Sequence, residues 1–346
     1  MNKHVWKMWL GALLIAVSMV PHESAYAQNR ARQADNPYRI YAITYRGRTD
    51  IEKGFEEYFR SRKIRVEITW RDLNLDSSRF PRFIEEIRAM KPDLVYTWGT
   101  SVTLGVVGPH DAIDPRLHII DTPVVFTLVA APVLAKIVPD LKSPGRNVTG
   151  VSHVAPTDTQ FRAMASYRPF QRVGVLYTPT EKNSVVLLEQ IRELGRHMGF
   201  KTVERKFRLD ANGRVTAEGA ADLVREIKQA NAEWLYLPPD SFLGTQAKEV
   251  VIPAAMAAGL PTFASTEQLM DTGALTALVS PYFMVGQFTA HKAKQILVDG
   301  VPAKDIPVET LKRLSFKVRM DAVEKLNMPP PLSLFNYAEI IPSGGS

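Results

Sequence analysis

The stretch PVVFTLVAAPVLAKIVPDLKSPGRNVTGVS, residues 123–152, decides the fold of this chain. It opens with the apolar run PVVF, which Thr127 ends, and this pattern is typical of a short strand buried on both faces of a parallel sheet. A helix-like patch and a turn-rich break at residues 143–147 follow, and a second strand-like piece occupies residues 148–152. Because strand–helix units repeat on both sides of this stretch, we expect one α/β lobe to pass to another here.

Strand-like and helix-like segments alternate along both halves of the chain, which favours doubly wound parallel sheets. In the first half, strands are expected at residues 38–44, 64–70, 92–97 and 123–127, and helices at 51–61, 77–90 and 102–107. In the second half, strands are expected at residues 172–177, 201–207, 234–238, 261–264, 275–279 and 313–318, and helices at 157–167, 181–198, 216–230, 242–258 and 285–297. Asp50 is expected to cap the helix 51–61, and Gly259 to end the helix 242–258.

Composition and the N-terminal residues predict an exported protein. The 346 residues suit two domains of ordinary composition. Residues 1–27 are predicted to be a cleaved signal peptide, because Lys3 and Lys7 precede an apolar run that ends at the small-residue site Ala25-Tyr26-Ala27. The chain contains no cysteine, which excludes disulfides and a lipid anchor on an N-terminal cysteine. We therefore expect a freely diffusing periplasmic protein.

Several function classes lack their sequence signals. The net charge is +7, but no long Lys/Arg block is present, so nucleic-acid binding is not expected. No G-x-S-x-G, P-loop or H-E-x-x-H motif occurs, and the seven histidines are not spaced as metal ligands. We therefore predict no catalytic residues, no metal site and no cofactor. His153 lies near a predicted hinge strand, where it is either a group that titrates at the hinge or, as the favoured interpretation, a solvent-exposed side chain.

Eight segments together resemble a known family. They are PVVFT (123–127), PGRNVTGVS (144–152), RVGVLYTP (172–179), LYLPPDS (235–241), GLPTFAS (259–265), GALTALVSPYFMVG (273–286), AKQILVDG (293–300) and IPVE (306–309). In their order and spacing, residues 38–330 resemble the tryptophan/tyrosine type of ABC transporter substrate-binding protein, with the type I periplasmic binding protein fold. Ala131 departs from this pattern, because the family often has an acidic residue before the proline that corresponds to Pro132.

The resemblance implies two α/β lobes joined by a three-strand hinge, with a small ligand held between them. The first lobe would comprise residues 38–151 and 281–308, and the second lobe residues 152–280 and 309–335. It further implies delivery of the ligand to an inner-membrane ABC permease. A monomer is expected as the default for a freely diffusing carrier, with the oligomeric state left open. Two alternatives remain open, namely a subunit that presents ligand to a membrane sensor and a two-lobed enzyme.

Candidate ligand-binding residues follow from the strand ends, where open α/β sheets bind ligands. In the first lobe they are Tyr45, Arg46, Trp98, Thr100, Ser101, Phe126 and Thr127. In the second lobe and at the hinge they are Tyr177, Asn183, Ser184, Asp240, Phe242, Ser265, Glu267 and Tyr282. For each the alternative is structural, such as a core position for Phe126 or a helix N-cap for Asp240.

These residues suggest an α-amino acid as the ligand, with an aromatic one as the leading choice, while purines, sugars and small organic acids stay open as alternatives. Thr100, Ser101 and the start of their helix would bind the carboxylate, and Asp240 from the other lobe would bind the ammonium group. The aromatic residues Tyr45, Trp98, Phe242 and Tyr282 would form a stacking surface.

Overall fold

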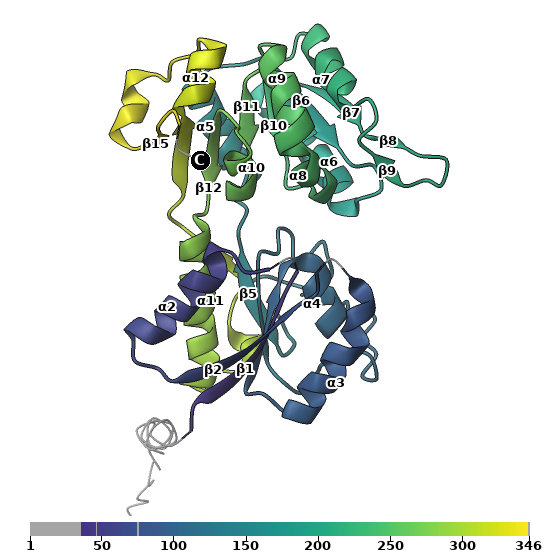
Figure 1. Cartoon of the computed structure of the whole chain (residues 1–346), viewed down its shortest axis with the longest axis vertical. Helices are drawn as coiled ribbons and strands as arrows, with labels where there is room; N and C mark the ends of the chain where they lie inside the picture. The colour runs from purple at the N-terminus through teal and green to yellow at the C-terminus, as the bar shows by residue number, and fades with distance from the viewer. Residues whose placement is uncertain (1–35, 46, 75, 345–346) are drawn as a thin grey trace, which may run out of the picture.

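Figure 1 shows the architecture of the chain in a computed structural model. The structure describes residues 36–344 except residues 46 and 75. The signal peptide predicted at residues 1–27 and the candidate residue Arg46 lie outside this part of the chain. Among the helices in the described residues, none has the length and apolar character needed to cross a membrane.

The first lobe is built on a six-stranded parallel sheet. In spatial order its strands are β13 (Glu309–Thr310), β5 (Val148–Ser152), β4 (Val124–Thr127), β3 (Leu94–Trp98), β1 (Tyr38–Thr44) and β2 (Val66–Asp72). The helices of this lobe are α2 (Asp50–Ser61), α3 (Phe80–Met90) with a 3₁₀ turn before it at Ser77–Arg79, α4 (Gly99–Val107) and α11 (Tyr282–Leu297).

The second lobe is built on a seven-stranded sheet. In spatial order its strands are β15 (Glu339–Ile341), β14 (Ser315–Arg319), β12 (Thr276–Val279), β11 (Thr262–Ala264), β10 (Trp234–Leu237), β6 (Arg172–Tyr177) and β7 (Lys201–Lys206). All neighbours are parallel except β12 and β14. The helices are α5 (Thr157–Tyr167), α6 (Lys182–Met198), α7 (Ala220–Gln229), α8 (Ser241–Gln246), α9 (Ile252–Ala257), α10 (Glu267–Asp271) and α12 (Met320–Leu326), and a small hairpin joins β8 (Arg208–Leu209) to β9 (Val215–Thr216).

Both lobes use the same strand order. Numbered along the chain within each lobe, the first five strands lie in the order 2-1-3-4-5, which is one of the two common doubly wound orders. The direction of winding reverses between β1 and β3 in the first lobe and between β6 and β10 in the second. The expected fold class, two doubly wound α/β lobes joined by a three-strand hinge, is therefore confirmed, with one antiparallel pair in the second sheet.

The chain crosses between the lobes three times (Figure 1). The crossings join β5 to α5, β12 to α11, and β13 to β14. β13 pairs with β5, so Glu309 and Thr310 lie in the first sheet, just past the boundary expected at residue 308. β15 pairs with β14, so the second sheet continues beyond the limit expected at residue 335.

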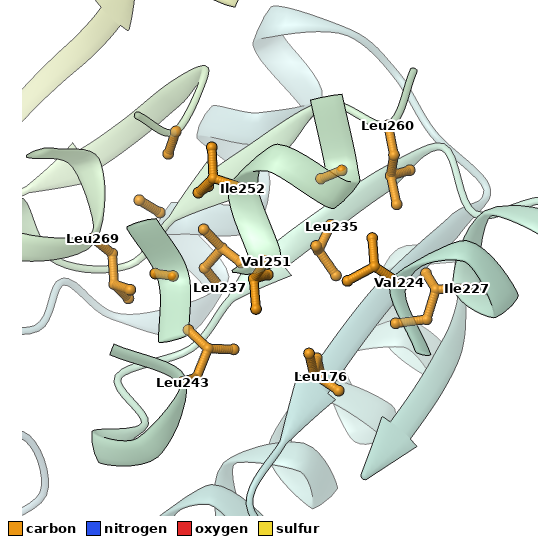
Figure 2. Close-up of a cluster of buried hydrophobic side chains, with 14 of the residues drawn as sticks. Leu176, Val224, Ile227, Leu235, Leu237, Leu243, Val251, Ile252, Leu260 and Leu269 are labelled. Atoms are coloured by element: carbon orange, nitrogen blue, oxygen red, sulfur yellow. The ribbon is translucent and has the colours of Figure 1, made fainter. Parts of the chain in front are cut away.

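Each sheet is covered by apolar side chains on both faces, as strands buried on two sides require. In the second lobe, α7, α8 and α9 cover one face (Figure 2), where Leu176, Leu235 and Leu237 from the strands meet Val224 and Leu243 from the helices. The other face packs mainly against α5 and α6. The first sheet is covered in the same way, by α3 and α4 on one face and by α2 and α11 on the other.

Some local predictions were wrong. Thr49, not Asp50, caps α2, because its side chain and that of Glu52 form a capping box. The helix expected over residues 242–258 is divided by a π-helical turn at Ala247–Val251. Pro253 explains this break, since its ring has no N–H to donate and clashes with the carbonyl four residues earlier. Gly259 ends the helix in a left-handed conformation, as predicted.

Candidate ligand-binding site between the facing edges

The three crossings determine which ends of the two sheets face each other. β5 ends where the chain leaves for the second lobe, and β12 ends where it returns. In parallel sheets all strands share that direction, so the carboxyl end of each sheet is turned towards the other lobe (Figure 1). We call these the first-lobe edge and the second-lobe edge. Ligands of open α/β sheets bind at such carboxyl ends, so most candidate residues lie on one of the two edges.

The first-lobe edge presents the start of α4. Gly99 adopts φ +80°, which turns the chain from β3 directly into the helix, and no Cβ-bearing residue adopts this conformation without strain. Trp98 makes no side-chain cap hydrogen bond to the helix. Thr100 is partly buried and Ser101 is exposed. Among the described residues, the N-cap side chain thus makes no bond to the first N–H groups of α4, and these groups form, with the two hydroxyls, a set of donors for an anion.

Aromatic side chains lie beside this helix start. The rings of Tyr45 and Trp98 are stacked, with their centroids 6.2 Å apart and their planes 9° from parallel. Trp98 and Tyr282 both pack on a small apolar cluster at this edge. Tyr282 also meets the ring of His153 edge-on at 6.3 Å. These contacts bring the candidates Tyr45, Trp98 and Tyr282 together on the hinge side of the first-lobe edge.

Asp240 lies on the second-lobe edge, at the point where the winding reverses, and its carboxylate is fully engaged. Thr178 donates to it from both N–H and Oγ1, each at 2.8 Å. Ser184 Oγ donates at 2.6 Å, and the N–H of Leu243 donates at 2.8 Å as in a helix N-cap. Asp240 is only 4% exposed. In this structure Asp240 is therefore the N-cap of α8, which was the structural alternative for this residue. Binding of a ligand ammonium group by Asp240 requires these four hydrogen bonds to rearrange, and it stays a prediction.

Glu181 is a second carboxylate on this edge, and it is more open than Asp240. It accepts hydrogen bonds from the N–H and the hydroxyl of Ser241, at 3.0 and 3.2 Å, and it is half-buried. Burial and then the nearby charge of Asp240 raise the pKa of Glu181 to about 7. Among the side chains that the structure describes, no lysine or arginine forms an ion pair with either carboxylate. A cation placed here would relieve the repulsion between them.

The remaining candidates divide between partly open and structural positions. Tyr177, Asn183 and Phe242 are partly buried on the second-lobe edge, and Phe242 packs edge-on against Phe207. Phe126 and Thr127 were expected to face the ligand, but both are 0% exposed, and Thr127 accepts a hydrogen bond from Thr289. These two are core residues, since β4 is central in its sheet.

Ser265 and Glu267 are also built into the fold. Ser265 is 0% exposed. Glu267 pairs with Lys317 at 2.6 Å and accepts a hydrogen bond from the N–H of Tyr282, across the second crossing. Its carboxylate therefore joins α10 to β14 and to the first turn of α11.

Two residues of this region were missed or misread from the sequence. Glu181 was read only as the start of a helix, although it follows a strand end as the chosen candidates do. His153 was expected to be exposed, and this was wrong, because it is 8% exposed at the first crossing. Burial lowers the pKa of His153 to about 3, so the imidazole is neutral in the folded protein. Nothing in the described part of the chain bonds to its Nδ1.

Metal binding has no support in the described side chains. Within residues 36–344, apart from residues 46 and 75, no three or more His, Asp or Glu side chains form a group that could ligate a metal ion. The chemistry available at the two edges is instead hydrogen bonding, charge pairing and aromatic stacking.

Two doubly wound α/β lobes joined by three crossings define the periplasmic binding protein-like fold. Residues 45–340 match the family described as ABC transporter substrate binding protein. The chain belongs to this family, as the sequence resemblance predicted.

Individual relatives are similar at a lower level. A curated tyrosine-binding protein from Clostridioides difficile is 26% identical over 209 residues, which cover 60% of this chain and 58% of that protein. The match thus spans less than two thirds of the relative's length.

Solved structures share the fold. A conserved domain protein from Vibrio cholerae has a TM-score of 0.72 at 20% identity, with 88% of this chain and 99% of that chain covered. A ligand-free, open substrate binding protein with adhesive properties from Clostridium difficile has a TM-score of 0.71 at 21% identity, with 88% and 99% covered. An ABC domain from Streptococcus pneumonia, in complex with L-Trp, has a TM-score of 0.69 at 21% identity, with 87% and 100% covered.

Proposed function

We propose that this protein is the solute-binding component of an ABC importer and that it holds an α-amino acid, with an aromatic one preferred, between its two edges. The observation that carries the proposal is the pairing of unlike charges across the lobes. The second-lobe edge has two carboxylates, Glu181 and Asp240, and none of the side chains that the structure describes pairs a cation with them. The first-lobe edge has the uncapped start of α4. A zwitterion complements both.

The ammonium group of the ligand is assigned to Glu181 rather than to Asp240 alone. Each oxygen of Glu181 accepts one hydrogen bond from Ser241 and has capacity for another, whereas the oxygens of Asp240 already accept four. The ligand's carboxylate is assigned to Thr100, Ser101 and the N–H groups of α4. Its side chain is assigned to the surface formed by Tyr45, Trp98 and Tyr282.

A ligand that contacts both lobes favours the closed arrangement, because only that arrangement satisfies both of its ends. We place the first lobe at residues 38–151 and 281–310, which adds β13 to the expected range, and the second lobe at residues 152–280 and 311–341. The protein would act without catalysis, as a monomer in the periplasm after removal of residues 1–27, and would deliver its ligand to an inner-membrane permease.

The test is a thermal-shift and calorimetric comparison of L-tyrosine and L-tryptophan with analogues that lack one charge. A ligand at about 100 times its Kd stabilises by about 2.7 kcal/mol, which a thermal shift detects. Tyramine lacks the carboxylate, and 3-(4-hydroxyphenyl)propionate lacks the ammonium group. We expect each analogue to bind at least roughly tenfold more weakly than L-tyrosine, since each leaves one charged edge unpaired.

Two matched variants test the role of Glu181 separately from the amino-acid-binding function. We expect Glu181→Gln to weaken L-tyrosine binding roughly tenfold, whereas Glu249→Gln, an exposed change in the same lobe, leaves it unchanged. Equal affinities of the two variants would refute the role of Glu181 while keeping the binding function. Failure of every amino acid to bind would refute the function itself.

Proton release gives an independent readout of Glu181. Its pKa of about 7 means that part of the population is protonated near neutral pH, and a bound ammonium group favours the ionised form. We therefore expect affinity to rise with pH up to about 7 and protons to be released on binding below that pH. Titrations in buffers of different ionisation enthalpy measure this release, which Glu181→Gln should abolish.

A further inference from the structure

The second lobe carries a groove that none of the proposed ligand contacts touches. It has a volume of about 530 Å³ and is lined from three directions, by α5, by the third crossing with β14, and by the C-terminal segment that contains β15. Thr178, Glu181 and Asp240 are not among its lining residues. Its volume falls within the range of small-molecule sites, about 300–1,000 Å³.

The floor of the groove is apolar and partly aromatic. Leu278 and Phe316 are paired neighbours on β12 and β14, and both line the groove. The ring of Tyr337 meets that of Phe316 edge-on at 6.1 Å and is 60% exposed. An exposed tyrosine over a buried phenylalanine gives a surface against which a flat ring can pack.

The charge of the groove is positive and poorly balanced. Arg162 and Arg313 both line it. Within the described chain Arg313 forms no ion pair, and Arg162 reaches only Asp158, at 3.9 Å with both side chains largely exposed. The acidic residue of the lining, Glu339, already lies 3.5 Å from Lys317. Two guanidinium groups without strong partners therefore flank the apolar floor.

We propose that this groove is a second binding site, selective for a small aromatic carboxylate, with the anion at Arg162 and Arg313 and the ring on Tyr337 and Phe316. Planar guanidinium groups match the geometry of a carboxylate and also stack on rings. An aromatic amine of the same shape would be repelled. Every lining residue belongs to the second lobe or to the third crossing, so none of them is among the proposed contacts of the importer ligand.

The experiment is a titration of the whole mature protein, labelled at Ala, Leu, Ile, Val and Met methyl groups, with phenylacetate followed by NMR. L-tyrosine is left out, because it also carries an aromatic ring and a carboxylate and competes for any site of this class; the location of the shifted methyl signals distinguishes the groove from the facing edges. We expect phenylacetate to shift the methyl signals of Ala163, Leu278 and Leu314, which line the groove, and 2-phenylethylamine to leave them unchanged. Shifts confined to methyl groups outside the groove lining, or no shifts at millimolar phenylacetate, would overturn the proposal.

Variants complete the test. Arg313→Gln and Arg162→Gln should each weaken phenylacetate binding roughly fivefold, the loss of one exposed charge-assisted contact of about 1 kcal/mol. Arg168→Gln is the matched control, because this exposed arginine follows α5 but does not line the groove. Both groove variants should bind L-tyrosine as the unmodified protein does. Equal phenylacetate affinity in all three variants would overturn the proposal.

Discussion

Asp240 illustrates how one carboxylate can organise an edge, since its two oxygens accept four hydrogen bonds from the surrounding chain. Its partners Thr178 and Ser184 lie 62 and 56 residues away in sequence, at the end of β6 and in α6. The carboxylate thus ties two strand ends and two helix starts into one unit. This unit fixes the backbone next to Glu181, which stays more open.

Replacing Asp240 by alanine should destabilise the fold. Four buried donors would lose their acceptor and α8 would lose its N-cap, so we expect a loss of about 3 kcal/mol in the free energy of unfolding. Urea denaturation of Asp240→Ala beside Glu181→Ala measures it, and the second variant should lose much less. An unchanged unfolding midpoint for Asp240→Ala would contradict this account.

His153 predicts a dependence of stability on pH. Its folded pKa of about 3 lies below the ordinary histidine value near 6.5, so the unfolded chain takes up a proton in this window and the folded chain does not. The contribution of neutral His153 to the free energy of unfolding is therefore fully present above about pH 6.5. It decreases as the pH falls below that value, by at most about 1.4 kcal/mol per pH unit.

The measurement is urea unfolding of His153→Phe at neutral and mildly acidic pH. Phenylalanine keeps an aromatic ring against Tyr282 but cannot be protonated. We expect this variant to lose less stability on acidification than the parent, and His197→Phe, at a largely exposed histidine, to behave like the parent. Identical pH profiles for the two variants would rule out this role for His153.

At the scale of elements, α2 and α11 pack closely against each other through a glycine on each helix. A Cβ on Gly54 would lie 2.1 Å from the carbonyl oxygen of Phe283, and a Cβ on Gly286 would lie 1.9 Å from that of Ile51. The two backbones therefore touch, and no larger residue fits between them. This contact attaches the element that follows the second crossing firmly to the first lobe.

Gly286→Ala should separate these helices. The added methyl group must displace backbone rather than a flexible side chain, so we expect a loss of about 3 kcal/mol in the free energy of unfolding. Gly244→Ala is the matched control, because its Cβ would meet only Gln268 Nε2, at 3.6 Å, in a helix where alanine is favoured. The idea fails if thermal denaturation shows the two variants to be equally stable.

Local sequence patterns predicted most elements but not what joins them. α5 begins and ends at the residues expected, and the apolar runs of β4 and β6 were located within one residue. The π-helical turn before Pro253 and the short strand β15 were missed, because one depends on a backbone clash and the other on pairing with β14.

The candidate site, too, could be predicted from the sequence only in part. Sequence reasoning located the edges, since strand ends can be read from periodicity. It could not predict the four donors to Asp240 or the burial of His153, because these depend on segments that are distant in sequence.

For the whole molecule, the three crossings are the only covalent links between the lobes in the described chain. The chain contains no cysteine, so two introduced cysteines can carry spin labels without competition. Glu85 in α3 and Lys248 beside α8 are exposed and lie on different lobes. The distance between labels at Glu85→Cys and Lys248→Cys therefore reports the separation of the lobes.

We expect L-tyrosine to shorten this distance, because a ligand that touches both edges favours the closed arrangement. Pulsed electron–electron double resonance measures the distribution of distances between the two labels with and without L-tyrosine. A label pair within the first lobe, Lys53→Cys and Glu85→Cys, should show no change. Tight binding with an unchanged distance between lobes would exclude closure as the response to ligand.

The position of α11 has a consequence for the order in which the molecule is made. Ala290, Ala293 and Leu297 of this helix complete the core on one face of the first sheet, together with Ile40 and Phe55. Synthesis runs from the N-terminus, so α2 alone covers this face until five of the seven strands of the second sheet have been translated. The lobe that is begun first cannot be finished first, and the nascent chain lacks a complete N-terminal lobe through most of its elongation.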